Sequence, residues 1–290
     1  MAKSPSHKFG QDLGILLEDV VLYEILKPRL EKFVESKKYY LDCRGTRGAR
    51  KGAKVTWLDK YGNRHDLDFV IEVGGTDDKI GRPIAFIEAA WRRYTKHSKN
   101  KAQEIQGALL PIIELHHLSA PFYGVVLAGE FTEPALAQLR NNNFAVIYIP
   151  YSDVVKAFES VDFDIEFDES TPDAVFKNAT KKLKALTKDD RSAIRRKLTQ
   201  LSRKETEVFM EKLKAALERC IKRIVLLPLF GKKYEFTSVD DALAKIDDVA
   251  LDRPDGDFNK FEVIVEYCNG DKIEAKFHDK TALSEFLGKL

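Results

Sequence analysis

Short, nearly continuous apolar segments alternate with helical segments through the first half of this chain. Three of them, Pro83–Ala90, Phe122–Ala128 and Phe144–Ile149, have the length and composition of strands buried on both faces of a sheet. Helices are expected between them, from about Ser98 to His117 and from Glu133 to Arg140. Because alternating strands and helices pack as a sheet with helices on its faces, the pattern predicts an α/β fold with a mixed β-sheet flanked by helices.

The residues before this region predict a long helix and three further strands. Apolar residues recur at helical spacing over residues 9–35, and Pro28 is expected to kink or end the first part of that helix. A strand is expected over residues 38–44. Two more, over residues 55–58 and 65–73, are joined by a turn that contains Gly and Asn.

Composition changes twice after the sheet region. The acidic stretch Val161–Asp173 marks a boundary near residue 160, and three helices are expected after it. From residue 224 a strand interrupted by Pro228 and an Asn-Gly hairpin predict a small α+β unit. The expected organisation is a core domain over 1–160, an acidic connector with a basic helical arm over 161–223, and a C-terminal domain over 224–290.

Charge is segregated along the chain although it nearly cancels in total. Lys and Arg number 48 and Asp and Glu 46, which leaves a net charge of +2. Residues 44–54 contain five basic and no acidic side chains, residues 153–173 contain eight acidic ones and one lysine, and residues 177–223 contain 16 basic and 6 acidic ones. Such blocks indicate a partner of high charge density.

The cysteines and the hydropathy pattern predict a soluble cytoplasmic protein. Cys43, Cys220 and Cys268 are far apart and form no CxxC pair, so free thiols in a reducing compartment are expected. No apolar run is long enough to span a membrane, and the polar N-terminus lacks the apolar core of a signal peptide.

Two carboxylates on neighbouring predicted strands are the main candidates for chemistry. Glu88 lies at the end of an otherwise apolar strand, and Asp68 lies on the strand before it. A buried charge is unfavourable unless it is paired or binds a cation, and carboxylate oxygens suit Mg²⁺. Asp68 and Glu88 are therefore a candidate metal pair, although an ordinary ion pair of Glu88 with Arg92 would also satisfy the pattern.

A basic run follows Glu88 directly. Residues 91–101 hold five basic side chains, a Trp and a Tyr, and they lead into an expected helix N-terminus. Lys and Arg neutralise phosphates, aromatic rings stack on bases, and a helix N-terminus favours anions. The run therefore favours a phosphate-binding site next to the carboxylates.

The order of these parts resembles the PD-(D/E)XK nuclease superfamily, the fold of many restriction endonucleases. A helix, a hairpin carrying Asp68, a strand ending in Glu88 and then helix, strand, helix and strand follow one another over about residues 9–150. In that family an Asp opens one strand and an acidic-x-Lys sequence lies on the next. The resemblance implies a restriction-endonuclease-like fold and Mg²⁺-dependent hydrolysis of DNA, as in a type II-like restriction or defence endonuclease.

Two residues depart from the family pattern. Leu67 replaces the Pro before the Asp, and Ala90 stands where the Lys is expected. Some members carry the basic group on the following helix, so Lys101 is the first candidate for this role and Lys96 the second. Acidic residues of the first helix, Glu18 or Glu24, could assist the metal, although an exposed polar helix face is the better explanation of both.

The resemblance also implies a role for each candidate residue. Asp68 and Glu88 would hold one or two Mg²⁺ ions, and Lys101 or Lys96 would orient the attacking water and neutralise the phosphate. The expected nucleic-acid-binding residues are Arg44, Arg47, Arg50, Lys51, Arg92, Arg93 and Lys99. The expected partner is double-stranded DNA, and cutting both strands favours a homodimer.

Two other functions fit the same sequence. Ala90 supports a non-catalytic nucleic-acid-binding protein on a nuclease-like fold. The charge blocks are also compatible with an adaptor that assembles with another protein. Steep loss of DNA affinity with salt is expected from phosphate contacts and would separate the adaptor from the other two.

Overall fold

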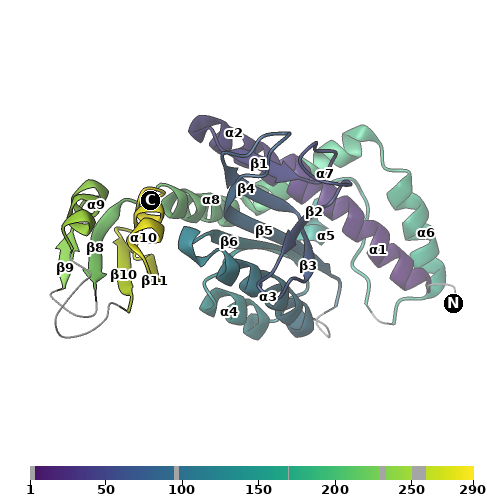
Figure 1. Cartoon of the computed structure of the whole chain (residues 1–290). Helices are drawn as coiled ribbons and strands as arrows, with labels where there is room; N and C mark the ends of the chain where they lie inside the picture. The colour runs from purple at the N-terminus through teal and green to yellow at the C-terminus, as the bar shows by residue number, and fades with distance from the viewer. Residues whose placement is uncertain (1–3, 95–97, 169, 229–232, 250–258) are drawn as a thin grey trace. The chain divides into compact units, whose positions relative to one another are not determined.

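A computed structural model describes residues 4–94, 98–168, 170–228, 233–249 and 259–290 (Figure 1). The chain forms two compact units, the first of Met1–Glu114 and Tyr123–Leu213 and the second of Leu115–Phe122 and Lys214–Leu290. The boundaries between the units do not coincide with the changes of composition near residues 160 and 223. The segment expected as a connector and arm is therefore divided between the two units.

A five-stranded mixed sheet forms the centre of the first unit, as the alternation of strands and helices predicts. Its strands lie in the order β1-β4-β5-β6-β7. Antiparallel pairs join β1 to β4 and β4 to β5, whereas β6 and β7 are parallel. The bounds are β1 (Tyr40–Cys43), β4 (Phe69–Val73), β5 (Arg82–Arg92), β6 (Phe122–Gly129) and β7 (Ala145–Pro150).

Helices cover both faces of this sheet. On one face α3 (Ser98–Leu115) and α4 (Glu133–Asn141) bury Ile105, Leu109 and Leu136 against strand residues such as Val125 (Figure 1). On the other, α1 (Pro5–Glu18) contacts β5. A π-helix, η1 (Asp19–Leu26), continues α1 into α2 (Lys27–Lys37). Pro28 therefore does not end the helix; the π-helical turns precede it, where its missing N–H interrupts the α-helical ladder.

Two of the three basic helices after the acidic stretch pack within the first unit. The helix α6 (Asp173–Lys184) packs against α1, and α7 (Lys188–Leu201) packs against η1 and α5 (Tyr151–Glu159). The third basic helix, α8 (Arg203–Leu217), includes residues of both units. Buried apolar side chains on each helix, such as Phe176, Ile194 and Phe209, explain why these highly charged segments are helical and anchored.

The strand expected over residues 65–73 is broken at Asp68. Its first part, β3 (Arg64–Leu67), pairs with β2 (Val55–Leu58) in a separate two-stranded ribbon, while β4 joins the main sheet. Residues 65–73 therefore do not form one continuous strand. The break leaves Asp68 at a corner, immediately before β4.

The second unit consists of an antiparallel sheet and helices in two similar halves. Each half is a hairpin followed by a helix: β8 (Ile221–Leu227), β9 (Tyr234–Phe236) and α9 (Val239–Asp248), then β10 (Phe261–Tyr267), β11 (Lys272–Phe277) and α10 (Lys280–Leu287). The sheet order is β11-β10-β8-β9. The predicted Asn-Gly hairpin is confirmed between β10 and β11, where Gly270 has a φ of +91° that a side chain would disfavour.

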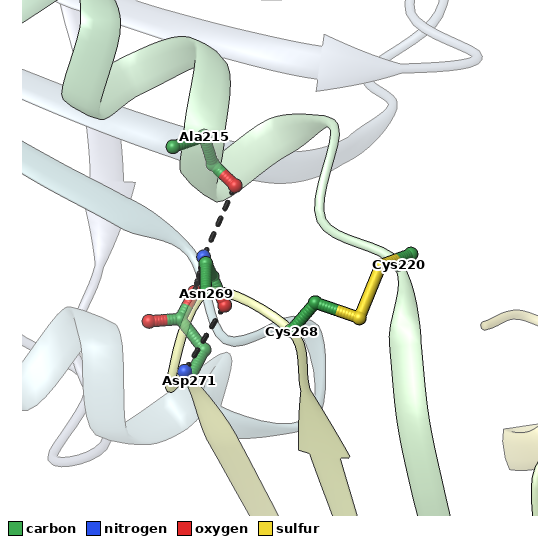
Figure 2. Close-up of a disulfide and its surroundings, with 5 residues drawn as sticks. All are labelled: Ala215, Cys220, Cys268, Asn269 and Asp271. Atoms are coloured by element: carbon green, nitrogen blue, oxygen red, sulfur yellow. Dashed lines mark hydrogen bonds between the residues drawn. A yellow bond between two sulfur atoms is a disulfide. The ribbon is translucent and has the colours of Figure 1, made fainter.

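Two cysteines expected as free thiols form a disulfide instead. Cys220 and Cys268 are bonded at the ends of β8 and β10, whose pairing brings their Cα atoms to 5.6 Å (Figure 2). Asn269, beside the disulfide, donates to the carbonyl of Ala215 at 3.0 Å. Their separation of 48 residues gave no signal in the sequence, because the pairing arises from strand register. Disulfides are typical of oxidising compartments, and the cytoplasmic location stays a prediction.

No helix within the described ranges is both long enough and apolar enough to cross a membrane.

Candidate functional site

Asp68 and Glu88 are neighbours across two paired strands. Phe69 of β4 lies opposite Ile87 of β5, and continuing this antiparallel register by one residue sets Asp68 opposite Glu88. The backbone N–H of Ala89 donates to Asp68 Oδ2 at 2.7 Å and so holds the Asp68 side chain toward β5. The two carboxylates that the sequence placed on neighbouring strands therefore lie together.

Both carboxyl groups have raised pKa values. Burial raises the pKa of Asp68 to about 6, and the hydrogen bond from Ala89 opposes part of that rise. Burial, followed by the negative charge of Asp68, raises the pKa of Glu88 to about 8. Lys101 acts in the opposite direction on both groups, since a nearby cation favours the ionised form. Perturbed carboxyl pairs of this kind are characteristic of functional sites, and of structural ion pairs as well.

The two carboxylates line a cavity of about 340 Å³. Its other walls come from α1 and η1, including Glu18, and from Ala90 and Trp91 on β5. Trp91 is held against α1 because its indole N–H donates to the carbonyl of Gly10 at 3.1 Å. Glu18, proposed as an assisting residue, therefore faces the same space as the pair, whereas Glu24 lies 3.5 Å from Arg195 in an ion pair.

One oxygen of this site has no partner. Glu88 Oε2 is buried and makes no hydrogen bond within the described part of the chain. A buried carboxylate oxygen without a donor is unfavourable, so this atom fits a cation that approaches from the cavity. Among the described residues no group of three or more His, Cys, Asp or Glu side chains is arranged to hold a metal. Residues of the chain that could hold Mg²⁺ are thus Asp68 and Glu88, with the remaining ligands from water or substrate.

Among the described basic residues, Lys101 has the largest electrostatic effect on this pair. It lies on α3, is 23 % exposed, and forms an ion pair with Glu104 at 3.4 Å. Its charge lowers the pKa of both carboxyls, which places it in electrostatic reach of them. Lys96, the second candidate, lies outside the described residues.

The predicted nucleic-acid-binding residues divide into exposed and internal ones. Arg44, Lys51 and Lys99 are exposed. Arg44 directly follows β1 and acts electrostatically on Asp68, which lies beside it in the continued β1–β4 register. Arg92 lies 3.7 Å from Glu104 and is partly exposed, so it can reach solvent.

Arg47, expected to bind nucleic acid, is buried instead: its side chain is only 2 % exposed. It pairs with Asp42 and Glu72, each at 2.8 Å, and donates to the carbonyls of Thr76 and Lys79. Through these contacts the guanidinium connects the loop that follows β1 with β4 and with the loop that follows β4. An arginine saturated by internal acceptors has no donor left for a phosphate in this conformation.

Arg50 and Arg93 are also held inside the protein. Arg50 pairs with Asp42 at 3.2 Å and donates to two backbone carbonyls, so it supports the same loop. Arg93 is 7 % exposed and lies among the rings of Phe9, Tyr94 and Phe176. The sequence of a basic run does not indicate which side chains face inward, because their acceptors lie on residues far away in the chain.

Tyr23 interacts electrostatically with Asp68 and was not a candidate from the sequence. It lies on η1 against Phe69, at 5.8 Å between ring centroids, and its hydroxyl is buried without a hydrogen-bond partner in the described structure. Burial, and then the charge of Asp68, raises the pKa of Tyr23 to about 12. The available signal in the sequence was the hydroxyl of a tyrosine on the apolar face of the first helix, but such a face is typical of an ordinary hydrophobic core.

Comparisons with known proteins assign no family to the chain. No protein-family model matches the sequence, and no curated protein matches it. A solved structure that matches is the crystal structure of a protein of unknown function, AF1548, with a TM-score of 0.27 and 10% identity over 63% of this chain and 96% of that chain. The similarity is too low to assign a fold or a function.

Proposed function

We propose that this chain is a Mg²⁺-dependent nuclease that hydrolyses phosphodiester bonds in double-stranded DNA, with Asp68 and Glu88 as metal ligands. The observation that supports this most is the buried, unpartnered Oε2 of Glu88 beside Asp68 in the wall of a cavity. Two adjacent carboxylates repel each other when both are ionised, and a bound divalent cation removes this repulsion.

Each residue of the site has a role in this proposal. When bound, Mg²⁺ lowers the pKa of a coordinated water and offsets charge that develops on the phosphate. Asp68 is held in place by the N–H of Ala89, and Glu88 lines the cavity and has one carboxylate oxygen without a hydrogen-bond donor. Lys101 orients the water and neutralises the scissile phosphate, while the exposed Arg44, Lys51 and Lys99 and the partly exposed Arg92 hold the backbone.

The proposal includes membership of the PD-(D/E)XK superfamily and a restriction-endonuclease-like fold. The position of Asp68 directly before β4, with Glu88 beside it on β5, supports this assignment. So does the mixed sheet with helices on both faces. A restriction or defence role, with two sites in a homodimer to cut both strands, is part of the same proposal.

One observation favours a second function, non-catalytic binding of nucleic acid. Ala90, which lines the cavity, stands where the family has its lysine, and Lys101 is engaged with Glu104. Without a basic group at the reacting phosphate, the fold would bind nucleic acid without cutting it.

Cleavage of plasmid DNA in Mg²⁺ and in EDTA tests the proposal. We expect cutting only with Mg²⁺, and a loss of at least about a hundredfold in rate for Asp68→Asn and for Glu88→Gln, because each removes a ligand charge. Asp66→Asn, an exposed neighbour outside the cavity, is the matched control and should cut normally. Full activity of both ligand variants would refute the site, and binding with a steep salt dependence but no cutting would favour the second function.

The same assay tests the lysine. Lys101→Ala should slow cutting by about 10²-fold or more, whereas Lys99→Ala, on the same helix and exposed, should change mainly the affinity for DNA. Equal effects of both substitutions would mean that the basic group comes from elsewhere, with Lys96→Ala as the next variant.

A further inference from the structure

A second cavity, of about 480 Å³, adjoins the candidate metal site. It shares Gln11 and Trp91 with the first cavity and extends over the start of α1 and the end of β5. Arg92 and Arg93 line it on one side. Ser4, Ser6 and His7, from the N-cap and first turn of α1, line it on the other.

Arg93 is a buried cation without a carboxylate partner among the described residues. It is 7 % exposed, and its Nε is buried and makes no hydrogen bond. Its two terminal nitrogens donate to the carbonyl and hydroxyl of Ser6 at 3.3 and 3.2 Å. Burial lowers its pKa, and aromatic rings attract the guanidinium without supplying a negative charge.

The neighbouring helix makes this arrangement less favourable still. The N-terminus of α1 carries the positive end of the helix dipole, and its first turn contains no acidic residue. Asp12, the first carboxylate along α1, lies 3.9 Å from Lys8 and 3.6 Å from Lys184 instead. Helix dipole and buried guanidinium therefore add positive potential in one cavity, which an anion would offset.

We propose that this second cavity is a phosphate-binding subsite, in which Arg93 and the first turn of α1 hold a phosphate group of the polynucleotide. The donors for a phosphate are the Nε–H of Arg93, which makes no hydrogen bond among the described residues, and the backbone N–H of Ser6. Pro5 has no N–H, and the N–H groups of His7 and Lys8 already donate to Ser4. Arg92 is four residues from Glu88 on β5, about 13 Å along the strand, so the bound phosphate lies a few nucleotides from the scissile one. The identity of the ligand as a polynucleotide rests on the proposed nuclease function; the anion site does not.

His7→Glu tests the subsite without removing a buried side chain. His7 is exposed, lines the cavity and lies in the first turn of α1, so a glutamate there supplies the missing negative charge from within the chain. Thr281→Glu, in the first turn of α10, is the matched control, because it adds the same charge at another exposed helix start.

The probe is inorganic phosphate in EDTA, at constant ionic strength set with chloride. Phosphate at ten times its dissociation constant should raise the melting temperature of the wild type by about 3 °C. The rise should persist in Thr281→Glu and in Asp68→Asn, and affinity should fall at least about tenfold in His7→Glu and in Arg93→Met. A phosphate response that is absent from the wild type, or unchanged in both cavity variants, overturns the subsite.

Duplex oligonucleotides with 5′-phosphate or 5′-hydroxyl ends then identify the source of the phosphate. Loss of affinity in His7→Glu for the phosphorylated duplex alone assigns a terminal phosphate, and an equal loss for both assigns a backbone phosphate. Normal duplex affinity in His7→Glu, with the phosphate response lost, overturns the polynucleotide as ligand and leaves the anion site. Because these measurements use EDTA, failure of the proposed cleavage does not affect them.

Discussion

Glu88 is held in a position where its ionised form is unfavourable. Its carboxyl group is buried beside that of Asp68, and one of its oxygens has no donor in the described structure. The folded chain therefore binds a proton at Glu88 up to about pH 8, whereas an ordinary glutamate releases it near 4.5. The ionised form of Glu88 is therefore unfavourable, and a bound cation would stabilise it.

Stability should consequently fall as the pH rises in EDTA. Between about pH 4.5 and pH 8 the unfolded chain has lost the Glu88 proton while the folded chain retains it, so the free energy of unfolding decreases through this window and levels off above it. Glu88→Gln should remove the part of the decrease above about pH 6, whereas Asp68, with its pKa raised to about 6, still contributes below it. The variant should stabilise the protein at pH 8 by about 1–2 kcal/mol, below the full value of about 1.4 kcal/mol per pKa unit because the side chain is partly exposed.

Denaturant unfolding at pH 5 and pH 8 measures this effect. Glu159→Gln makes the same chemical change at an exposed position and should behave like the wild type at both pH values. If Glu88→Gln and the wild type lost stability equally between pH 5 and pH 8, Glu88 would not be the titrating group.

At the scale of elements, the cavities depend on the close approach of α1 to β5. A Cβ at Gly14 would lie 2.7 Å from Cδ1 of Trp91, so the helix can lie on this ring only because residue 14 has no side chain. Trp91 also lines both cavities. The contact between Gly14 and Trp91 thus links helix packing to the shape of the site.

Two alanine substitutions on the same helix should have opposite effects. Gly14→Ala forces Trp91 to move and should destabilise the protein by about 1–3 kcal/mol, with reduced binding of DNA and phosphate. Gly10→Ala meets nothing within 4 Å and should stabilise α1 by about 0.5–1 kcal/mol, since alanine loses less backbone entropy than glycine. Thermal unfolding of both variants measures the difference, and destabilisation by Gly10→Ala would contradict the assigned contacts.

At the scale of the whole molecule, two units carry separate cores, and the disulfide belongs to one of them. Cys220 and Cys268 close a loop with a sequence separation of 48 within the second unit. The core of that unit includes Ile224, Phe261 and Leu283. Loss of the bond should therefore affect the second unit alone.

The double variant Cys220→Ser/Cys268→Ser should destabilise the second unit by about 2–4 kcal/mol, because its unfolded chain is no longer cross-linked. Hydrogen exchange should show faster opening in β8 and β10 with unchanged protection in β4 and β5. Reductant added to the wild type should reproduce the result, and Cys43→Ser should leave the second unit unaffected. Unaltered exchange in β8 and β10 on reduction would contradict the pairing.

The main elements of the first unit were predictable because their signals are local. An apolar run or a helical repeat reports how buried each position is, and β5, β6 and β7 coincide with the expected strands within a few residues. That Asp68, immediately before β4, would lie beside Glu88 on β5 also followed from the order of these elements. The elements β9 and α9 were not predicted; β9 spans only three residues, too few to show a strand alternation.

The sequence by itself determined the type of the main elements, their order and the residues that are capable of chemistry. Tertiary structure alone decided which partner each side chain contacts. Arg47 is buried against Asp42 and Glu72. Arg93 donates to Ser6 in the first turn of α1, and Cys220 is bonded to Cys268. The physical reason is that periodicity depends on neighbours a few residues away. Ion pairs, disulfides and cavities depend on strand register and helix packing between residues that are far apart in the chain.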